Sequence, residues 1–189
     1  MLYEVILDSG ETPNKCTIAP LQSRADFRLY PVKGNHPLGP LQSPILLNHE
    51  GECLSVLRKS LTPVAGIASI DCIWRRLNTI LRRVAAPMPV LARIPEGFRT
   101  AYPRRSSLES DPEAGLATIE AIFVASALLG NWDASLLANY YFGRKFVNLN
   151  ANRFAELGVE QALRDDSMPV LLPRKRSSLQ RRRDRGKRE

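Results

Sequence analysis

Three short runs in the first 71 residues consist almost wholly of apolar, strand-forming side chains. They are YEVIL at residues 3–7, SPILLN at residues 43–48, which the turn residue Gly51 follows, and GIASID at residues 66–71. None of them alternates cleanly between apolar and polar positions, as a strand with one solvated face does. A strand that is covered on both faces has this pattern. The sequence therefore predicts a parallel sheet, with residues 90–94 as a further strand.

From Trp74 onward the apolar spacing is that of helices. An apolar stripe with arginines on the remaining faces predicts an amphipathic helix with a basic outer side. Its members are Trp74, Leu77, Leu81 and Val84. Residues 118–129 predict a helix, with Gly130 as its C-terminal cap. A shorter helix opens at Asp133 and ends near Gly143, and a last one covers residues 145–157. Strands that come first and helices that come late predict an α/β fold in which a C-terminal helical layer packs on the sheet.

The composition is that of an ordinary globular protein. The chain has 189 residues, 44% apolar and 24% charged, and a chain of this length can bury roughly 70% of its unfolded surface. The three cysteines and two histidines are scattered, so we expect no metal and no Cys/His catalysis. No apolar stretch approaches the ~20 residues of a membrane span. Residues 1–7 lack the pattern of a signal peptide, so we expect a cytoplasmic protein with no membrane partner.

The positive charge is concentrated at one end of the chain. Residues 174–189 hold nine Lys or Arg and two acids, a net +7, which leaves +1 of the total +8 for the preceding chain. Because this segment has almost no apolar residue to bury, we expect residues 161–189 to form a linker and a disordered basic tail. Such a tail attracts polyanions, and RNA is the partner that we expect. A tail that only improves solubility is the alternative.

Common signatures of nucleotide, zinc-protease and hydrolase sites are absent from the sequence: there is no GxGxxG, Walker loop, HExxH or GxSxG. Five local patterns are informative through their order. They are NKCT at residues 14–17, ILLN at 45–48, IDCIW at 70–74, GLATIEA at 115–121 and YFGRKF at 141–146, with Asn150 after the last. This order resembles the 3-amino-3-carboxypropyl (acp) transferases that modify a pseudouridine of small-subunit rRNA. The resemblance covers about residues 4–154.

The middle of the chain is also similar to the DTW-domain proteins, which modify tRNA. The residues that carry this likeness are Asp71 and Trp74 with the arginines that follow, then Tyr102, Arg104 and Arg105. Where the rRNA enzymes have an N-P-x-N-Y-G loop, residues 95–115 of this chain are closer to the DTW pattern. The resemblance therefore leaves open whether rRNA or tRNA is the substrate.

The resemblance implies a SPOUT-like fold whose C-terminal part is a trefoil knot, a rare topology that periodicity does not predict. It implies a small N-terminal α/β lobe at residues 1–62 and a SPOUT-like parallel-sheet domain with C-terminal helices at residues 63–160. It also implies S-adenosylmethionine (SAM) as the cofactor and an RNA substrate, either free or in a pre-ribosomal particle. We expect a monomer.

Two residues of the IDCIW pattern are the main site candidates. Asp71 ends a buried strand and is the catalytic candidate, since its carboxylate could hold the ammonium of the cofactor or accept a proton from the target base. A helix N-cap for the segment that starts at Ile73 is the alternative role. Trp74 offers a flat apolar surface that could cover the methyl group and sulfur of the cofactor and so prevent methyl transfer. A core tryptophan is the alternative.

Further cofactor candidates come from the other patterns. Thr17, as the resemblance implies, offers a hydroxyl and an amide to the cofactor carboxylate, or is a plain turn residue. Thr118 opens a helix whose free amides suit the same carboxylate, or it caps the helix. Three leucines would form an apolar slot for adenine, or are plain core: Leu46, Leu47 and Leu116. Glu120 could orient a loop at the cofactor, or merely suit the helix dipole.

Arginines and aromatic residues in the middle of the chain are candidates for RNA binding. A phosphate track would come from Arg75, Arg76, Arg82, Arg83, Arg99, Arg104 and Arg105. Tyr102 or Phe98 could stack on a flipped base. A solvated helix face is the alternative for the helical arginines.

The sequence thus favours a SAM-dependent acp transferase that modifies a uridine or pseudouridine in RNA. A non-catalytic RNA-binding or ribosome-assembly factor is a second hypothesis. A SPOUT-type RNA methyltransferase is the third.

Overall fold

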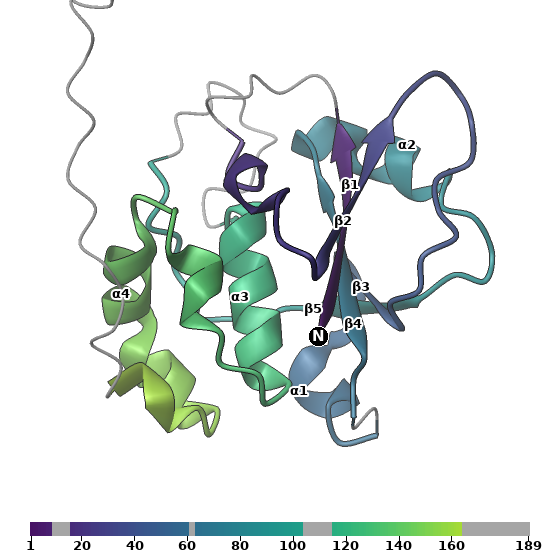
Figure 1. The fold of residues 1–189 in the computed structure, drawn as a ribbon. Helices are drawn as coiled ribbons and strands as arrows, with labels where there is room; N and C mark the ends of the chain where they lie inside the picture. The colour runs from purple at the N-terminus through teal and green to yellow at the C-terminus, as the bar shows by residue number, and fades with distance from the viewer. Residues whose placement is uncertain (9–15, 61–62, 104–114, 164–189) are drawn as a thin grey trace, which may run out of the picture.

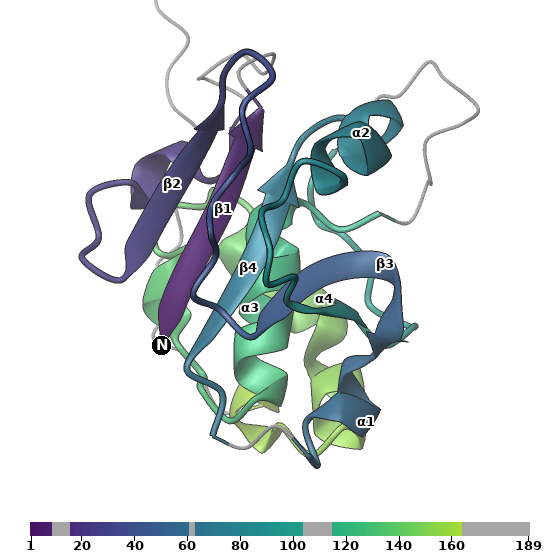
Figure 2. The same ribbon diagram turned by 90° about the vertical axis from the view of Figure 1, so that its right-hand side faces the viewer.

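The computed structural model describes residues 1–8, 16–60, 63–103 and 115–163. Five parallel strands form one sheet in the order β2-β1-β4-β3-β5, and Figure 2 shows most of this order face-on. The strands are β1 (Leu2–Asp8), β2 (Phe27–Val32), β3 (Ile45–Cys53), β4 (Gly66–Asp71) and β5 (Val90–Arg93). The helices are α1 (Leu54–Leu57), α2 (Leu77–Leu81), α3 (Thr118–Leu128) and α4 (Gly143–Glu156). Short 3-10 turns cover Ala19–Leu21, Trp74–Arg76, Ala134–Leu137 and Glu160–Leu163. The predicted α/β fold with a parallel sheet is confirmed.

Hydrophobic cores lie on both faces of the sheet. The larger core packs α3 and α4 on one face and contains Val5, Ile67 and Phe123. The smaller core, with Ile6 and Ile80, packs α2 on the other face. Figure 1 shows α3 and α4 on one side of the strands and α2 on the opposite side. Coverage of both faces explains why the strand sequences do not alternate.

The central strands β1 and β4 end side by side, because they are parallel and in register. β1 pairs with β4 in a register that sets Leu7 opposite Asp71. The chain leaves β1 toward β2 on one side and leaves β4 toward β5 on the other. In open α/β sheets, ligands bind at such a reversal, beside the carboxyl ends of the strands.

β2 is a strand that we did not predict from the sequence. It carries Pro31, whose missing N–H would interrupt a central ladder. The strand lies at the sheet edge and pairs only with β1. A proline can therefore be accommodated in this strand.

β3 continues beyond the predicted turn at Gly51. Its pairing with β5 shifts register between Leu47 and Glu52. A Cβ on Gly51 would lie 2.4 Å from the backbone carbon of Leu91, so a side chain there would collide with β5. Gly51 thus permits a close approach of two strands instead of ending one.

The helix predicted from Trp74 to Val84 is much shorter in the structure. Residues Trp74–Arg76 form a 3-10 turn and only Leu77–Leu81 are α-helical. The chain then pairs with Leu38 through a bridge to Val84, where the Leu38 amide donates to the Arg83 carbonyl at 2.8 Å. This tertiary pairing takes the backbone out of the helix.

Two of the C-terminal helices follow the prediction closely. α3 ends before Gly130, which has a φ of 87°, as a glycine cap requires. α4 begins at Gly143 and covers the predicted last helix. The helix predicted from Asp133 is instead the 3-10 turn Ala134–Leu137, in which the Asp133 side chain accepts the Ser135 N–H.

The proposed division near residue 62 stays a prediction. The strands before it and those after it alternate in one sheet, because β4 lies between β1 and β3. None of the helices in the described ranges has the length and apolar run needed to cross a lipid bilayer.

Candidate functional site

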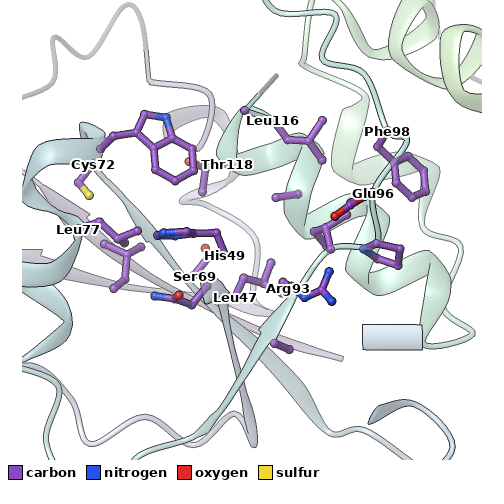
Figure 3. Close-up of a pocket in the computed structure, with 18 of the residues that line it drawn as sticks. Leu47, His49, Ser69, Cys72, Leu77, Arg93, Glu96, Phe98, Leu116 and Thr118 are labelled. Atoms are coloured by element: carbon purple, nitrogen blue, oxygen red, sulfur yellow. The ribbon is translucent and has the colours of Figure 1, made fainter. Parts of the chain in front are cut away.

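A pocket of about 980 Å³ lies beside the middle of β3 and the carboxyl ends of β4 and β5. Its volume is near the top of the ~300–1,000 Å³ that small-molecule sites occupy. Three segments wall it: the turn and helix after β4, the chain that follows β5, and the start of α3. Figure 3 shows side chains from these segments around one space.

The pocket lining combines apolar walls with charged groups. Its apolar members include Leu47, Ile70, Trp74, Leu77, Ala92, Phe98 and Leu116. Its polar and charged members are Asn48, His49, Ser69, Arg75, Asn78, Arg93, Glu96 and Thr118. A ligand with a broad apolar part and a few charged groups fits this chemistry.

Asp71 is buried beside the pocket and is bound to one of the residues that line it. The Thr118 hydroxyl donates to Oδ1 of Asp71 at 2.6 Å, and the Cys16 thiol donates to Oδ2 at 3.2 Å. The turn after β4 has Ile73 as its N-cap, with no side-chain cap. Asp71 therefore does not cap that turn; it joins the end of β4 to the start of α3.

Cys16, the other partner of Asp71, is only partly buried. Burial, together with the adjacent Asp71 carboxylate, raises the pKa of the Cys16 thiol to about 11. A thiol with this pKa is a weak nucleophile at neutral pH, because the thiolate is the reactive form. The role of Cys16 in the structure is to donate a hydrogen bond to Asp71.

Trp74 is a wall of the pocket. It is partly exposed and belongs to neither hydrophobic core. The His49 ring meets it edge-on, with 5.7 Å between centroids and an interplanar angle of 79°. The other tryptophan, Trp132, packs against Phe123 at 4.8 Å and joins the larger core. The two tryptophans thus have different surroundings.

Glu120 organises the walls of the pocket from a fully buried position. Its carboxylate accepts the Thr100 hydroxyl at 2.6 Å and the Ala101 and Ala117 amides at 2.9 Å each. It also accepts the Tyr140 hydroxyl at 2.9 Å. The chain after β5, the start of α3 and the segment before α4 are thereby tied to one carboxylate. The predicted role of Glu120 in orienting a loop agrees with these contacts.

Three predicted cofactor residues are not part of the pocket lining: Asp71, which lies beside it, and Leu46 and Thr17. Leu46 is fully buried in the smaller core, on the opposite face of the sheet from Leu47. The reason is the strand itself, in which successive side chains point to opposite faces. Thr17 is partly exposed next to Cys16 and does not line the pocket. Leu47, Trp74, Leu116 and Thr118 do come together there.

The predicted RNA-binding residues are spread over the molecule. Arg75 lines the pocket, whereas Arg76 pairs with the buried Asp8 at 2.8 Å. Arg99 is exposed, and its backbone is clamped by the Asn150 amide through two 2.8 Å hydrogen bonds. The Tyr102 ring packs edge-on against Phe142 at 6.0 Å. Arg104 and Arg105 lie outside the described residues.

Arg83 supports the fold through its side chain. Its guanidinium donates to the carbonyls of His36 at 2.9 Å and Lys33 at 3.3 Å. Within the described ranges, no group of three or more His, Cys, Asp or Glu is arranged to hold a metal ion.

Sequence reasoning missed several polar members of the pocket. Asn48 and His49 come from β3, Ser69 from β4, and Arg93 and Glu96 from β5 and the chain after it. The ILLN pattern ends on Asn48, but the pattern drew attention to its leucines. Only the pairing of β3 with β4 and β5 brings these residues together.

Comparison with known proteins gives one informative likeness. No protein-family model matches the chain, and no curated protein matches its sequence. Among solved structures, the chain is similar to the SAM-dependent rRNA acp-transferase Tsr3 from Vulcanisaeta distributa. The TM-score is 0.59 and the identity 20%, over 87% of this chain and 90% of that one. The two chains share a fold. The predicted likeness to DTW-domain proteins stays a prediction.

Proposed function

We propose that this protein is a SAM-dependent enzyme that transfers the acp group to a uridine or pseudouridine of RNA. The observation that carries the proposal is the pocket at the sheet edge, walled by Trp74, Leu47, Leu116 and Thr118. It supports the proposal because four residues selected for this chemistry from the sequence meet in one space, in the fold of an acp-transferase.

The residues of the pocket fit the chemical groups of SAM. Leu47 and Leu116 offer apolar contact to a nucleoside, and Arg93 offers a positive charge to a carboxylate. Negative charge for the ammonium is available from Glu96 in the lining and from Asp71 behind Thr118. SAM supplies an electrophilic carbon next to a sulfonium, and the residues supply binding and orientation.

Catalysis in this proposal is mainly positional. Holding two reactants in line lowers the barrier by up to ~7–11 kcal/mol. Trp74, as a wall of the pocket, would cover the methyl group of bound SAM and so leave the acp arm as the group available for transfer. Asp71, fixed by Thr118 and Cys16, keeps the wall at the start of α3 in place.

The RNA side of the proposal rests on exposed basic residues around the pocket. Arg75 lines the pocket wall. The backbone of the exposed Arg99 is held by hydrogen bonds to the Asn150 side-chain amide. We propose that Arg104, Arg105 and the basic tail complete the surface, with Tyr102 or Phe98 near the base. The substrate would be rRNA or tRNA, including RNA in a pre-ribosomal particle. A SPOUT-like knot, a monomeric state and a cytoplasmic location complete the proposal.

Calorimetry tests the cofactor part directly. We expect SAM to bind with a Kd in the micromolar range, about −7 to −9 kcal/mol. No heat and no thermal shift at millimolar SAM would rule out the proposed cofactor.

Nucleoside mass spectrometry tests the reaction. RNA from cells that lack the gene should lack one acp-modified nucleoside, and the purified protein with SAM should restore it. Restoration of a methylated nucleoside would instead identify a methyltransferase. RNA binding with no modification would identify a non-catalytic assembly factor.

A further inference from the structure

Two buried polar groups without partners lie in the lining of the pocket. Asn48 is 5% exposed and Ser69 is 3% exposed. Neither the Asn48 Nδ2 nor the Ser69 Oγ has a hydrogen-bond partner within the described part of the chain. Buried polar groups are nearly always paired, so two unpaired groups in one pocket point to a ligand that completes them.

The sheet opens where these two residues lie. β3 pairs with β4 only through Ile45 opposite Ile67 and Leu46 opposite Ala68. Ser69 comes directly after the last paired position of β4, and Asn48 lies two residues after that of β3, where the strands separate. We call this pair, Asn48 and Ser69, the pocket floor.

The orientation of the Asn48 amide is fixed by the chain. Its Oδ1 accepts the Glu50 N–H at 2.8 Å, which leaves Nδ2 as the end without a partner. An NH₂ group can only donate, so the ligand must offer an acceptor there. The Ser69 hydroxyl can donate or accept.

The chemistry of the floor selects a neutral group that offers hydrogen-bonding atoms. Neither Asn48 nor Ser69 carries a charge, and apolar lining residues adjoin them, among them Leu47, Ile70 and Ala92. The charged lining residues come instead from other segments of the wall, as Arg75, Arg93 and Glu96 do. A nucleoside, with acceptor atoms on an otherwise apolar body, suits the floor better than the charged amino-acid arm does.

We propose that Asn48 and Ser69 bind the adenosine part of the cofactor, with Asn48 Nδ2 donating to an acceptor of that nucleoside. This inference rests on the proposed function. The pair then determines which nucleoside the pocket accepts, whereas the charged wall holds the amino-acid arm.

The test uses methylthioadenosine as the probe, because it has the adenosine part and lacks the charged arm. Calorimetry would compare the wild type with Asn48→Asp, Ser69→Ala and Ser43→Ala. Asn48→Asp keeps an oxygen for the Glu50 N–H and removes the donor. Ser43 is a control, since its hydroxyl is also buried but lies outside the pocket lining.

We expect methylthioadenosine to bind about tenfold more weakly to Asn48→Asp and several-fold more weakly to Ser69→Ala, as the loss of one hydrogen bond implies. Ser43→Ala should bind like the wild type. Amide NMR of the wild type gives a second readout without any substitution. The Asn48 side-chain NH₂ signals should shift when methylthioadenosine is added.

Unchanged affinity in both floor variants, with unmoved Asn48 signals, would overturn the inference and leave SAM binding by the wild type intact. Uridine provides the opposing probe. Binding of uridine that depends on Asn48, while methylthioadenosine binding does not, would assign the floor to the target base and overturn the adenosine assignment. A wild type that binds neither SAM nor methylthioadenosine would refute the proposed function together with the inference.

Discussion

Substitution of Trp74 and of Trp132 distinguishes a residue that lines the pocket from one that belongs to the core. Trp74 lines the pocket, whereas Trp132 packs on Phe123 and Phe154. We expect Trp74→Ala to remain folded, to bind SAM more weakly and to lose on the order of 100-fold in turnover, because the reacting methylene is misplaced. Trp132→Ala should lose about 3 kcal/mol of stability. Thermal midpoint, SAM affinity and acp product, measured together, distinguish the two. Global unfolding of Trp74→Ala would assign it to the core instead.

The Cys16 thiol should be unreactive until the pH is high. With a pKa of about 11 in place of 9.0, its thiolate fraction at pH 8 is about 100-fold below that of an ordinary thiol. Alkylation of folded protein, followed by peptide mass spectrometry, measures this. Asp71→Asn should speed the reaction, since the carboxylate contributes to the raised pKa. Rapid alkylation of Cys16 at pH 8 in the wild type would contradict the buried hydrogen bond.

The raised Cys16 pKa also has a consequence for stability. The folded protein holds this proton more tightly than the unfolded chain does. The contribution is therefore complete below pH 9 and is lost as the pH rises toward 11. Asp71→Asn should make the alkaline decline shallower.

At the level of elements, the walls of the pocket depend on Glu120, which joins three segments through four hydrogen bonds. Glu120→Gln places an amide group against donors, so we expect a loss of about 3–5 kcal/mol, as for a broken buried network. Tyr140→Phe removes only one donor and should cost about 1.5–3 kcal/mol. Urea unfolding of both variants measures the difference. An equal or smaller loss for Glu120→Gln would show that the carboxylate does not unite these segments.

At the scale of the whole molecule, we expect the basic tail to contribute to RNA binding and not to cofactor binding. Residues 174–189 carry +7 and lie outside the described residues, whereas the pocket lining comes from residues 47–121. Deletion of these residues should weaken RNA binding at low salt, reduce its salt dependence and leave SAM affinity unchanged, because the tail acts through counterion release. Filter binding across a salt series, with calorimetry for SAM, measures both. An unaltered salt slope would exclude the tail from the RNA site.

The sequence alone determined what depends on neighbouring residues. Apolar runs without alternation identified the strands β1, β3 and β4, because burial on both faces leaves a local signature. Apolar periodicity and the glycine cap, which also depend only on neighbouring residues, identified α3. Ordered motifs selected Leu47, Trp74, Leu116 and Thr118, which the fold brings into one pocket.

Only the tertiary structure decided what depends on distant partners. Pairing with Leu38 ends α2 early, and the edge position of β2 accommodates Pro31. The alternation of β3 sends Leu46 into the smaller core, although its neighbour Leu47 reaches the pocket. The separation of β3 from β4 exposes Asn48 and Ser69 to one space. These outcomes follow from strand pairing across the sheet, which brings together residues that are far apart in the sequence and that no local pattern connects.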